Sequence, residues 1–385
     1  MWGVRMALPL EGIKVLDFSN LLPGPFCTMN LAELGAYVVK VERPSGGDAV
    51  RKSKRMFHSI NRNKKSITLD LKDNTDIEFI KTYLKNCDVL VEGFRPGVMK
   101  KLGLSYQEVI EINHSIIYCS ISGYGQTGAR SSIPGHDVNY LALSGLLSIS
   151  GEPDGPPAAR GGVPIADLSA GMYAVVAILA ALRNRDKKGS GDFIDVSITD
   201  SALAWMSPRI GSYYDQSQPS KEQFLTKGAY GTYLTKDNEY IAIGTLEDHF
   251  FRSLCLSIDH PELIKNEKYR TWELRSKNAN SLNAIIEKKL QEKSAQEWVQ
   301  IFSQYDLPCC NVNGITDLPN EKTFEDRDII EYYGDKDKGE YYVKFPVQFL
   351  NLVLQDNKSA PKLGEHNLKL MENDWENTQE KEGKI

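Results

Sequence analysis

The first 44 residues hold the pattern that most limits how this chain can fold. "GIKVLDFS" (Gly12–Ser19) is a short apolar run, "FCTMNLAELG" (Phe26–Gly35) has helical composition, and "AYVVKVERP" (Ala36–Pro44) is a second apolar run. Two buried strands joined by a helix form a βαβ unit, which requires parallel strands in one sheet. The alternation continues to about residue 200. The sequence therefore predicts an α/β fold with a large, Rossmann-like, doubly wound domain.

The turn between the two predicted strands limits the ligand. It reads "NLLPGP" (Asn20–Pro25) and lacks the glycines of a GxGxxG motif. Those glycines let the backbone approach the pyrophosphate of a dinucleotide. We therefore do not expect an NAD or FAD site.

The pattern changes after about residue 223. "GAYGTYLTKDNEYIAIGT" predicts an antiparallel hairpin that turns at Asp237 and Asn238, and charged helical segments follow it. We therefore expect a smaller α+β domain over residues 223–312. The final segment contains several prolines and then becomes polar.

Charge argues against nucleic acid as a partner. The net charge is −5, so the field of the whole molecule repels a polyanion. The basic residues are nevertheless uneven, because "RKSKRMFHSINRNKK" (Arg51–Lys65) holds seven Lys or Arg and no acid. This block is either a solvated face or a site for a small polyanionic molecule.

The cysteines and the apolar runs bear on location. The six cysteines have no zinc-type spacing, which favours reduced thiols in the cytoplasm and no metal site. "AGMYAVVAILAAL" (Ala170–Leu182) is the longest apolar run, with 13 residues. A membrane span needs roughly 20, so we expect a buried helix and no membrane association.

Three side chains are candidates for chemistry. His136 in "SSIPGHDVNYLALSG" is either structural or a catalytic acid/base, since no ligand set for a metal accompanies it. Asp167 precedes a long Ala-rich helix, where a carboxylate either caps the helix or acts as a base or nucleophile. Glu247 in "TLED" stands where a helix begins, and an acid is common there without any chemical role.

Several basic residues of the first domain are suited to a ligand with phosphates. Arg43, Arg95 and Lys101 belong to this group, together with the basic block. Surface solubility is the alternative for any one of them.

Seven motifs in order resemble a known family. They are "GIKVLDFSNLLPGPFCTMNLAELGAYVVKVERP", "KSITLDLK", "VLVEGFRPGVMKKLGLSY", "YCSISGYGQTG", "GHDVNYLALSG", "ADLSAGM" and "APKLGEH". Together they resemble the family III coenzyme A transferases, the CaiB/BaiF-like proteins, from about Leu10 to about His366. Within that family the chain looks most like the α-methylacyl-CoA racemases.

The resemblance implies a domain plan. A large CoA-binding domain would begin with residues 1–197, and the chain would return to it over residues 337–385. The small domain of residues 223–312 would lie between linkers at 198–222 and 313–336. The family forms interlocked homodimers in which each active site lies between the large domain of one subunit and the small domain of the other.

The resemblance to the racemases also implies a reaction. It is the interconversion of (2R)- and (2S)-2-methylacyl-CoA by 1,1-proton transfer through an enolate. His136 and Asp167 would be the two acid/base groups, and Glu247 would orient His136. Backbone N–H groups at the start of the helix over residues 168–185 would hold the enolate oxygen. Neither a metal nor a redox cofactor is expected, since coenzyme A is part of the acyl-CoA substrate.

Residues that match the family's CoA contacts come from several motifs. They are Arg43, Leu69, Asp70, Leu71, Lys72, Arg95, Lys101, Gly135, Asp137 and Tyr140. Lys101 stands where some relatives have Arg, which keeps the charge but loses the bidentate fork.

The alternative within the same family is transfer of CoA between carboxylic acids. Asp167 would then form an acyl and a CoA adduct in turn, so this residue does not separate the two reactions. His136 does, because family transferases for small carboxylates usually lack the histidine of the GHD motif. The presence of His136 therefore favours the racemase at this stage.

Overall fold

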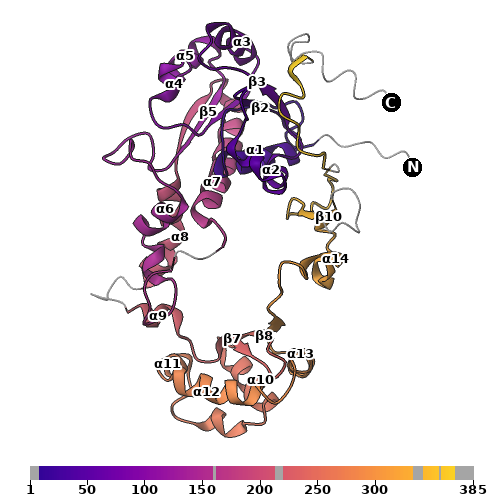
Figure 1. The fold of residues 1–385 in the computed structure, drawn as a ribbon. Helices are drawn as coiled ribbons and strands as arrows, with labels where there is room; N and C mark the ends of the chain where they lie inside the picture. Colours follow the sequence, from indigo (N-terminus) through magenta and orange to yellow (C-terminus); the bar gives the residue numbers. More distant parts are fainter. Residues whose placement is uncertain (1–7, 159–161, 213–219, 333–340, 355–356, 369–385) are drawn as a thin grey trace. The chain divides into compact units, whose positions relative to one another are not determined.

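The computed structural model of the chain describes residues 8–158, 162–212, 220–332, 341–354 and 357–368. It divides into two compact units. The first comprises Met1–Leu146, Gly161–Ile210 and Asp328–Ile385, and the second comprises Leu147–Arg160 and Gly211–Arg327. Each unit is described by itself below (Figure 1).

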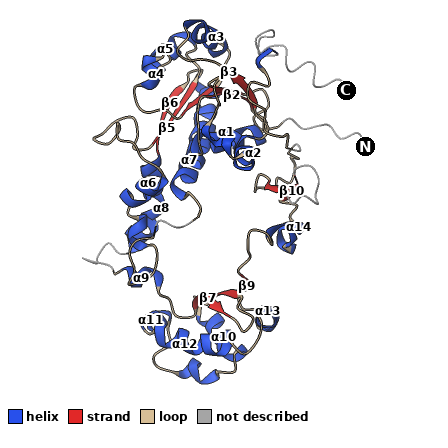
Figure 2. Cartoon of the chain, viewed as in Figure 1, coloured by secondary structure: helices blue, strands red, loops and turns tan. Residues whose placement is uncertain are grey.

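A six-stranded sheet forms the centre of the first unit (Figure 2). Its strands are β1 (Lys14–Asp17), β2 (Tyr37–Glu42), β3 (Lys65–Thr68), β4 (Val89–Glu92), β5 (Ile117–Ser122) and β6 (Asp192–Ser197). Their spatial order is β3-β2-β1-β4-β5-β6, and every neighbouring pair is parallel. β4 and β5 are buried along their whole length, as strands covered on both faces must be. The predicted Rossmann-like, doubly wound α/β domain is confirmed.

Helices cover both faces of this sheet. On one face, α3, α4 and α5 enclose alternate strand residues such as Leu16, Val39 and Leu90. On the other face, α1 packs against β1, β2 and β4, while α7 packs against α1, β5 and β6. The helices are α1 (Pro23–Glu33), η1 (Ala49–Lys52), α2 (Lys54–Asn61), α3 (Asn74–Leu84), α4 (Val98–Lys101), α5 (Tyr106–Ile112), α6 (Asp137–Leu143), α7 (Ile165–Lys188) and α8 (Ile198–Ser212).

The long helix α7 is longer than the sequence predicted. It begins after Pro164 and ends at Gly189, whose φ of 75° is the left-handed conformation that suits a glycine C-cap. Among the described residues it is the one helix long and apolar enough to cross a membrane, and half of its most apolar window is buried within the protein. A core helix of a soluble protein meets the same criteria, so this finding does not decide between the two.

The second unit combines a small sheet with helices. Strands β7 (Tyr230–Leu234) and β8 (Tyr240–Gly244) form the predicted antiparallel hairpin, and β9 (Cys309–Asn311) extends the sheet. Its core joins Ile241 and Ile243 of the sheet to Leu254, Ile286 and Trp298 of the helices. The helices are η2 (Leu146–Ile149), α9 (Lys221–Leu225), α10 (Asp248–Ser257), η3 (Pro261–Lys265), α11 (Trp272–Lys277), α12 (Ala279–Leu290), α13 (Ala295–Gln304), η4 (Leu318–Asn320) and α14 (Lys322–Asp326).

The end of the chain returns to the edge of the large sheet. β10 (Ile330–Tyr332) pairs with β11 (Tyr341–Val343), and the "APKLGEH" motif then lies along β3. The His366 N–H donates to the Ser66 carbonyl oxygen at 3.0 Å, and Arg51 donates to the Pro361 carbonyl oxygen at 3.0 Å. This motif therefore completes the sheet edge.

The units differ in detail from the domain boundaries drawn from the sequence. Residues 198–222, predicted to be a linker, contain α8 and the start of α9, and the first unit extends to Ile210. Leu147–Arg160 belongs with the second unit although it precedes α7 in the chain.

Candidate active site

The strand order places a topological switch between β1 and β4. Connections leave these two neighbouring strands in opposite directions, and ligands of doubly wound sheets bind beyond the strand ends at such a switch. Asp17 ends β1 and Glu92 ends β4. The loops that follow these two residues therefore form the expected position of the site.

The N-termini of α6 and α7 meet through Asp137. Its Oδ1 accepts the Ala166 N–H at 2.8 Å and the Asp167 N–H at 3.2 Å. The Leu168 N–H donates to the Pro164 carbonyl oxygen at 3.1 Å. Because these donors are already used, the prediction that the first N–H groups of this helix hold an enolate oxygen is wrong.

Asp167 is the third residue of α7, whose N-cap is Pro164, so the interpretation of Asp167 as an N-cap is wrong. Burial, together with the nearby Asp137 carboxylate, raises the pKa of the Asp167 carboxyl to about 7. Within the described ranges, no donor forms a hydrogen bond with this carboxyl group. The group is thus held in an environment that disfavours its charge, as expected of a reactive carboxylate.

His136 lies at the N-cap of α6, and its backbone N–H donates to Asn139 Oδ1 at 2.9 Å. Its side chain is exposed. The residue after His136, Asp137, accepts the N–H of Asp167. The backbones of His136 and Asp167 therefore lie close together at the corner where α6 and α7 begin. The structure therefore brings together these two predicted catalytic residues of the first unit.

Tyr140 lies on α6, beside the corner where α6 and α7 begin. Its ring is buried and meets Tyr124 edge to face, with ring centroids 5.3 Å apart. Gly123 and Gly135 leave room for it, since a Cβ on Gly135 would lie 2.7 Å from Tyr140 Cε1. Burial, with the Asp167 charge as the next cause, raises the pKa of the Tyr140 phenol to about 12. Of these predicted CoA contacts, Gly135 and Tyr140 pack against each other, and Asp137 caps α7.

The other predicted CoA contacts lie at the carboxyl edge of the sheet. Arg43 follows β2 and donates from Nε to the Gly47 carbonyl oxygen at 3.0 Å. Arg95 lies in the loop after β4 and Lys101 ends α4, and both side chains are exposed. These three cations come from the connections that follow β2 and β4, the two strands on either side of β1.

The "LDLK" segment follows β3. Leu69 is buried in the core, so only its backbone is available to a ligand. Leu71 is half-buried, and Asp70 and Lys72 are exposed. The Lys72 N–H donates to Asp70 Oδ1 at 3.0 Å, which makes the segment a tight turn.

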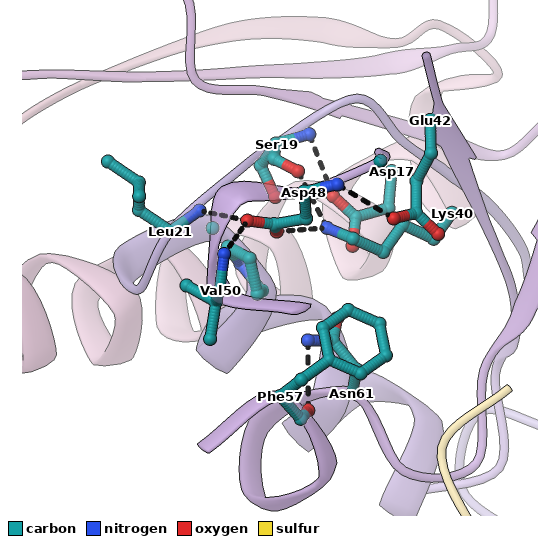
Figure 3. A network of polar contacts seen from close by, with 12 residues as sticks. Asp17, Ser19, Leu21, Lys40, Glu42, Asp48, Val50, Phe57 and Asn61 are labelled. Atoms are coloured by element: carbon teal, nitrogen blue, oxygen red, sulfur yellow. Dashed lines mark hydrogen bonds and ion pairs between the residues drawn. The ribbon is translucent and has the colours of Figure 1, made fainter. Parts of the chain in front are cut away.

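A network of buried charges under the β1 and β2 loops was missed by sequence reasoning (Figure 3). Lys40 Nζ lies 3.0 Å from Asp48 Oδ2 and donates to the Ser19 carbonyl oxygen at 2.7 Å. Lys64 Nζ lies 3.1 Å from Asp17 Oδ2, and the four charged side chains are wholly buried. The lysine at position 40 was read as part of an apolar strand, because alternation alone does not reveal a paired charge.

Opposing effects set the protonation of this network. Burial alone would raise the pKa of the Asp17 carboxyl, but the charges of Lys64 and Lys40 and the Ser19 and Thr28 hydroxyls hold it well below its usual range. Burial also lowers the pKa of the Lys64 ammonium to about 8, against the attraction of Asp17. The pair is therefore charged near neutral pH.

The basic block of residues 51–65 contains both exposed cations and cations that pair with buried acids, so the interpretation as a solvated face holds for only part of it. Arg51 pairs with Glu42 at 2.6 Å, Arg62 with Glu33 at 2.6 Å, and Lys64 is buried as described. Its exposed cations are Lys52, Lys54 and Arg55. Much of the block therefore serves the core, and the signal that could have revealed this is the set of acids on the neighbouring strand and helix.

The network supports the loop next to α7. Asp48 Oδ1 accepts the Leu21 N–H at 3.2 Å and holds Leu21 at a φ of 67°, which is rare for a leucine. The loop then reaches α7, where a Cβ on Gly171 would lie 2.8 Å from the Pro23 carbonyl oxygen. Gly171 lies about one turn beyond Asp167. The buried charges thus help to fix the surroundings of Asp167.

Another buried carboxyl group, that of Glu92, was also not predicted from the sequence. It accepts a hydrogen bond from the Ser120 hydroxyl and the Phe94 N–H at 2.7 Å, and Gln126 Nε2 donates to Ser120 Oγ at 2.7 Å. Burial raises the pKa of the Glu92 carboxyl to about 7, although both hydrogen bonds favour the charged form. This group fixes the start of the loop that carries Arg95.

Glu247 lies in the second unit, at the N-cap of α10. The Phe251 N–H donates to its carbonyl oxygen at 3.1 Å, while its side chain is exposed and makes no capping bond. The pairing of Glu247 with His136 stays a prediction, because each unit is described by itself.

Two further observations concern metals and thiols. Within the described ranges, no three His, Cys, Asp or Glu side chains cluster as metal ligands. All six cysteines are free, and Cys27, Cys87, Cys119 and Cys255 are buried.

The geometry defines a doubly wound α/β protein with a half-buried carboxyl group of raised pKa where two helices begin. The chain belongs to CoA-transferase family III, whose sequence profile matches residues 10–367. A CaiB/BaiF family protein from Brucella suis has a solved structure with 28% identity and a TM-score of 0.85, covering 95% of this chain and 99% of that one. The family resemblance seen in the motifs is confirmed.

Two human relatives bear on the reaction. Succinyl-CoA:glutarate CoA-transferase is 36% identical over 370 residues, covering 93% of this chain and 84% of that protein. Alpha-methylacyl-CoA racemase is 31% identical over 384 residues, covering 95% and 93%. The transferase is the more similar of the two, so the comparisons favour the CoA-transferase alternative over the racemase prediction.

Proposed function

We propose that the chain moves CoA between carboxylic acids through covalent intermediates on Asp167. The observation that carries the proposal is the half-buried Asp167 carboxyl, which is near Asp137 and receives no hydrogen bond from the described residues. A carboxylate that is poorly solvated when ionised is a stronger nucleophile than one in water. The greater similarity to a CoA-transferase supports the same proposal.

The reaction balances through two exchanges at one carboxylate. Asp167 attacks the thioester carbonyl carbon, a C–O bond forms, the C–S bond breaks and CoA thiolate leaves, which gives a mixed anhydride. The thiolate then attacks the aspartyl carbonyl of the anhydride, which releases the donor acid and leaves CoA on Asp167 as a thioester. The acceptor carboxylate reverses both steps, and Asp167 is regenerated.

We propose dicarboxylic acids as the substrate class. The support is the name of the human relative, which transfers CoA from succinyl-CoA to glutarate. The CoA phosphates would meet Arg43, Arg95 and Lys101, which lie in the connections that follow β2 and β4 at the carboxyl edge of the sheet. Lys72 and the backbone of Leu69–Leu71 would complete the contacts.

Racemisation of 2-methylacyl-CoA is the second candidate, and a specific observation favours it. His136 and Asp167 lie at the same corner, and the pKa of Asp167 is raised to about 7. A group with that pKa gives and takes a proton with similar ease near neutral pH, as a two-base mechanism requires. Glu247 would then stabilise the His136 imidazolium from the small domain.

One pair of assays separates the two reactions. In the first, succinyl-CoA and labelled glutarate are incubated with the protein, and labelled glutaryl-CoA is measured. In the second, one epimer of a 2-methylacyl-CoA is incubated in heavy water, and deuterium at the α-carbon is measured together with optical purity. We expect the labelled thioester and no deuterium; deuterium with loss of optical purity and no CoA movement would replace the first candidate by the second.

Two variants sharpen the result. Asp167→Asn should abolish either reaction while CoA still binds. His136→Ala should abolish proton exchange but leave CoA transfer within about threefold, because the histidine is not needed for carboxylate attack. Loss of transfer in His136→Ala would contradict the mechanism proposed for Asp167 alone.

We also propose a homodimer. Apolar side chains on α7 and α8 are exposed in the single chain, among them Met172, Tyr173, Val176, Leu203 and Trp205. An exposed apolar face of this kind favours association of subunits. The free cysteines support our proposal of a cytoplasmic location, where thiols stay reduced.

A further inference from the structure

Arg275 is a wholly buried cation in the second unit. It lies on α11, and its guanidinium carbon is 4.6 Å from the centre of the Phe251 ring. The backbone of Gly228 packs against that of Arg275 so closely that position 228 must be a glycine, because a Cβ on Gly228 would lie 2.3 Å from the Arg275 carbonyl oxygen. A buried arginine with this many fixed neighbours has one orientation, and that orientation determines what it holds.

The guanidinium contacts both residues that flank Glu247. Its Nη2 donates to the Leu246 carbonyl oxygen at 3.0 Å, and its Nη1 donates to Asp248 Oδ1 at 2.8 Å. Both bonds are charge-assisted on the donor side, and the second is an ion pair. The backbone of Glu247 is thus anchored immediately before and immediately after it.

Thr245, the residue before Leu246, adds a further anchor. It is wholly buried, and its N–H and hydroxyl both donate to the Ala229 carbonyl oxygen. The carboxylate of Glu247, in contrast, is exposed and does not fold back onto α10. A rigid backbone therefore presents a side chain that makes no bond to its own helix.

We propose that Arg275 is the positioning residue for Glu247. It fixes the segment from Leu246 to Asp248, so that a rigid backbone holds the Glu247 carboxylate exposed at the start of α10. The kinetic part of this inference rests on the proposed function, while the structural part does not. Arg275 itself touches neither substrate nor reacting atoms.

Asp248→Ala is the main test. It removes the exposed carboxylate that pairs with Arg275, which is one of the two guanidinium contacts that hold the segment, and it leaves Arg275 itself buried. We expect kcat of proton exchange, the candidate reaction in which Glu247 acts, to fall about tenfold with KM within about twofold, since a displaced group loses transition-state contacts. Glu267→Ala is the control: Glu267 is also an exposed partner of an arginine, Arg270 at 3.3 Å. The control should leave kcat unchanged.

The same change in a Glu247→Gln background separates positioning from stability. If Asp248 and Arg275 act through Glu247, Asp248→Ala costs nothing further once Glu247 is gone. An equal loss in both backgrounds would show a structural role and overturn the inference. So would a Glu247→Gln protein with full activity, although the role of Asp167 would stand.

Amide hydrogen exchange tests the anchoring without any reaction. Residues 246–249 should exchange at least about tenfold faster in Asp248→Ala and in Arg275→Lys than in the unaltered protein. Unchanged exchange in both variants would overturn the proposal. If the protein catalyses neither transfer nor racemisation, this measurement still decides whether Arg275 and Asp248 anchor the segment around Glu247.

Discussion

Replacing Lys64 by methionine should destabilise the first unit by several kilocalories per mole. Methionine keeps most of the apolar stem but removes the ammonium group. Lys64 Nζ lies 3.1 Å from Asp17 Oδ2 and donates to the Pro25 carbonyl oxygen and Asn61 Oδ1, each at 2.9 Å. The variant therefore leaves a buried carboxylate without its nearest cation and two acceptors without a donor.

The magnitude follows from burial. Breaking a buried pair by removing one partner costs about 3–5 kcal/mol. Lys40 remains near Asp17 and lowers the pKa of that carboxyl, so we expect the lower end, ~3 kcal/mol. The control is Lys81→Met, because Lys81 pairs with Glu78 at 2.8 Å on the exposed face of α3. An exposed pair contributes about 0.5 kcal/mol or less.

Urea unfolding followed by hydrogen exchange in peptides of β1 and β2 reports on the first unit alone. At a slope of about 3 kcal/mol per molar urea, Lys64→Met should lower the midpoint by ~1 M and Lys81→Met by less than ~0.2 M. The double variant Asp17→Asn with Lys64→Met should recover part of the loss, since no charge is then left unpaired. A Lys64→Met protein within about 1 kcal/mol of the unaltered protein would refute the reasoning.

Other predictions concern the corner where α6 meets α7. The pKa of Asp167 is raised from 3.8 to about 7, so its contribution to stability is present below pH 3.8 and is lost as pH rises through 7. Asp167→Asn should therefore be more stable than the unaltered protein by roughly 2–4 kcal/mol at pH 8 and equal to it at pH 4, measured by urea unfolding; an equal difference at both pH values would contradict this. Asp137→Asn should move the midpoint of kcat/KM for CoA transfer from pH 7 to a more acidic pH, and a fixed midpoint would show that the Asp137 charge does not act on Asp167. Gly171→Ala places a Cβ 2.8 Å from the Pro23 carbonyl oxygen and should reduce turnover about 10- to 100-fold, whereas Gly211→Ala, with no atom within 4 Å, should not.

Much of the fold was predictable because local patterns report it directly. Apolar runs of strand length and helical segments between them gave the parallel sheet, and turn residues gave the β7–β8 hairpin. The long α7 was predicted as a buried helix but with a later start and an earlier end. The start was placed too late because Asp167, an acid of the first turn, was interpreted as a residue that precedes the helix. The N-terminus of α7 is capped by Asp137, which belongs to α6. A cap that comes from another helix leaves no signal in the sequence next to the helix that it caps.

The site was predictable in part. His136 and Asp167 were identified from motifs, and the structure brings them together through Asp137. Glu92 and Lys64 were not identified, since nothing in the sequence tells a buried titratable group from an exposed one. The contacts that matter for them join strands and helices far apart in the chain.

The sequence by itself determined the family, the strand and helix periodicity and the residue types available for CoA-thioester chemistry. Only the tertiary structure decided which of the charged residues serve the core and which remain for a ligand. The basic block shows the physical reason: an arginine or lysine lowers the free energy of the fold when a buried acid on another element meets it, and is solvated when none does. Likewise, the raised pKa of the Asp167 carboxyl comes from its burial and from the Asp137 charge, which are properties of its surroundings in the fold and not of the residue type.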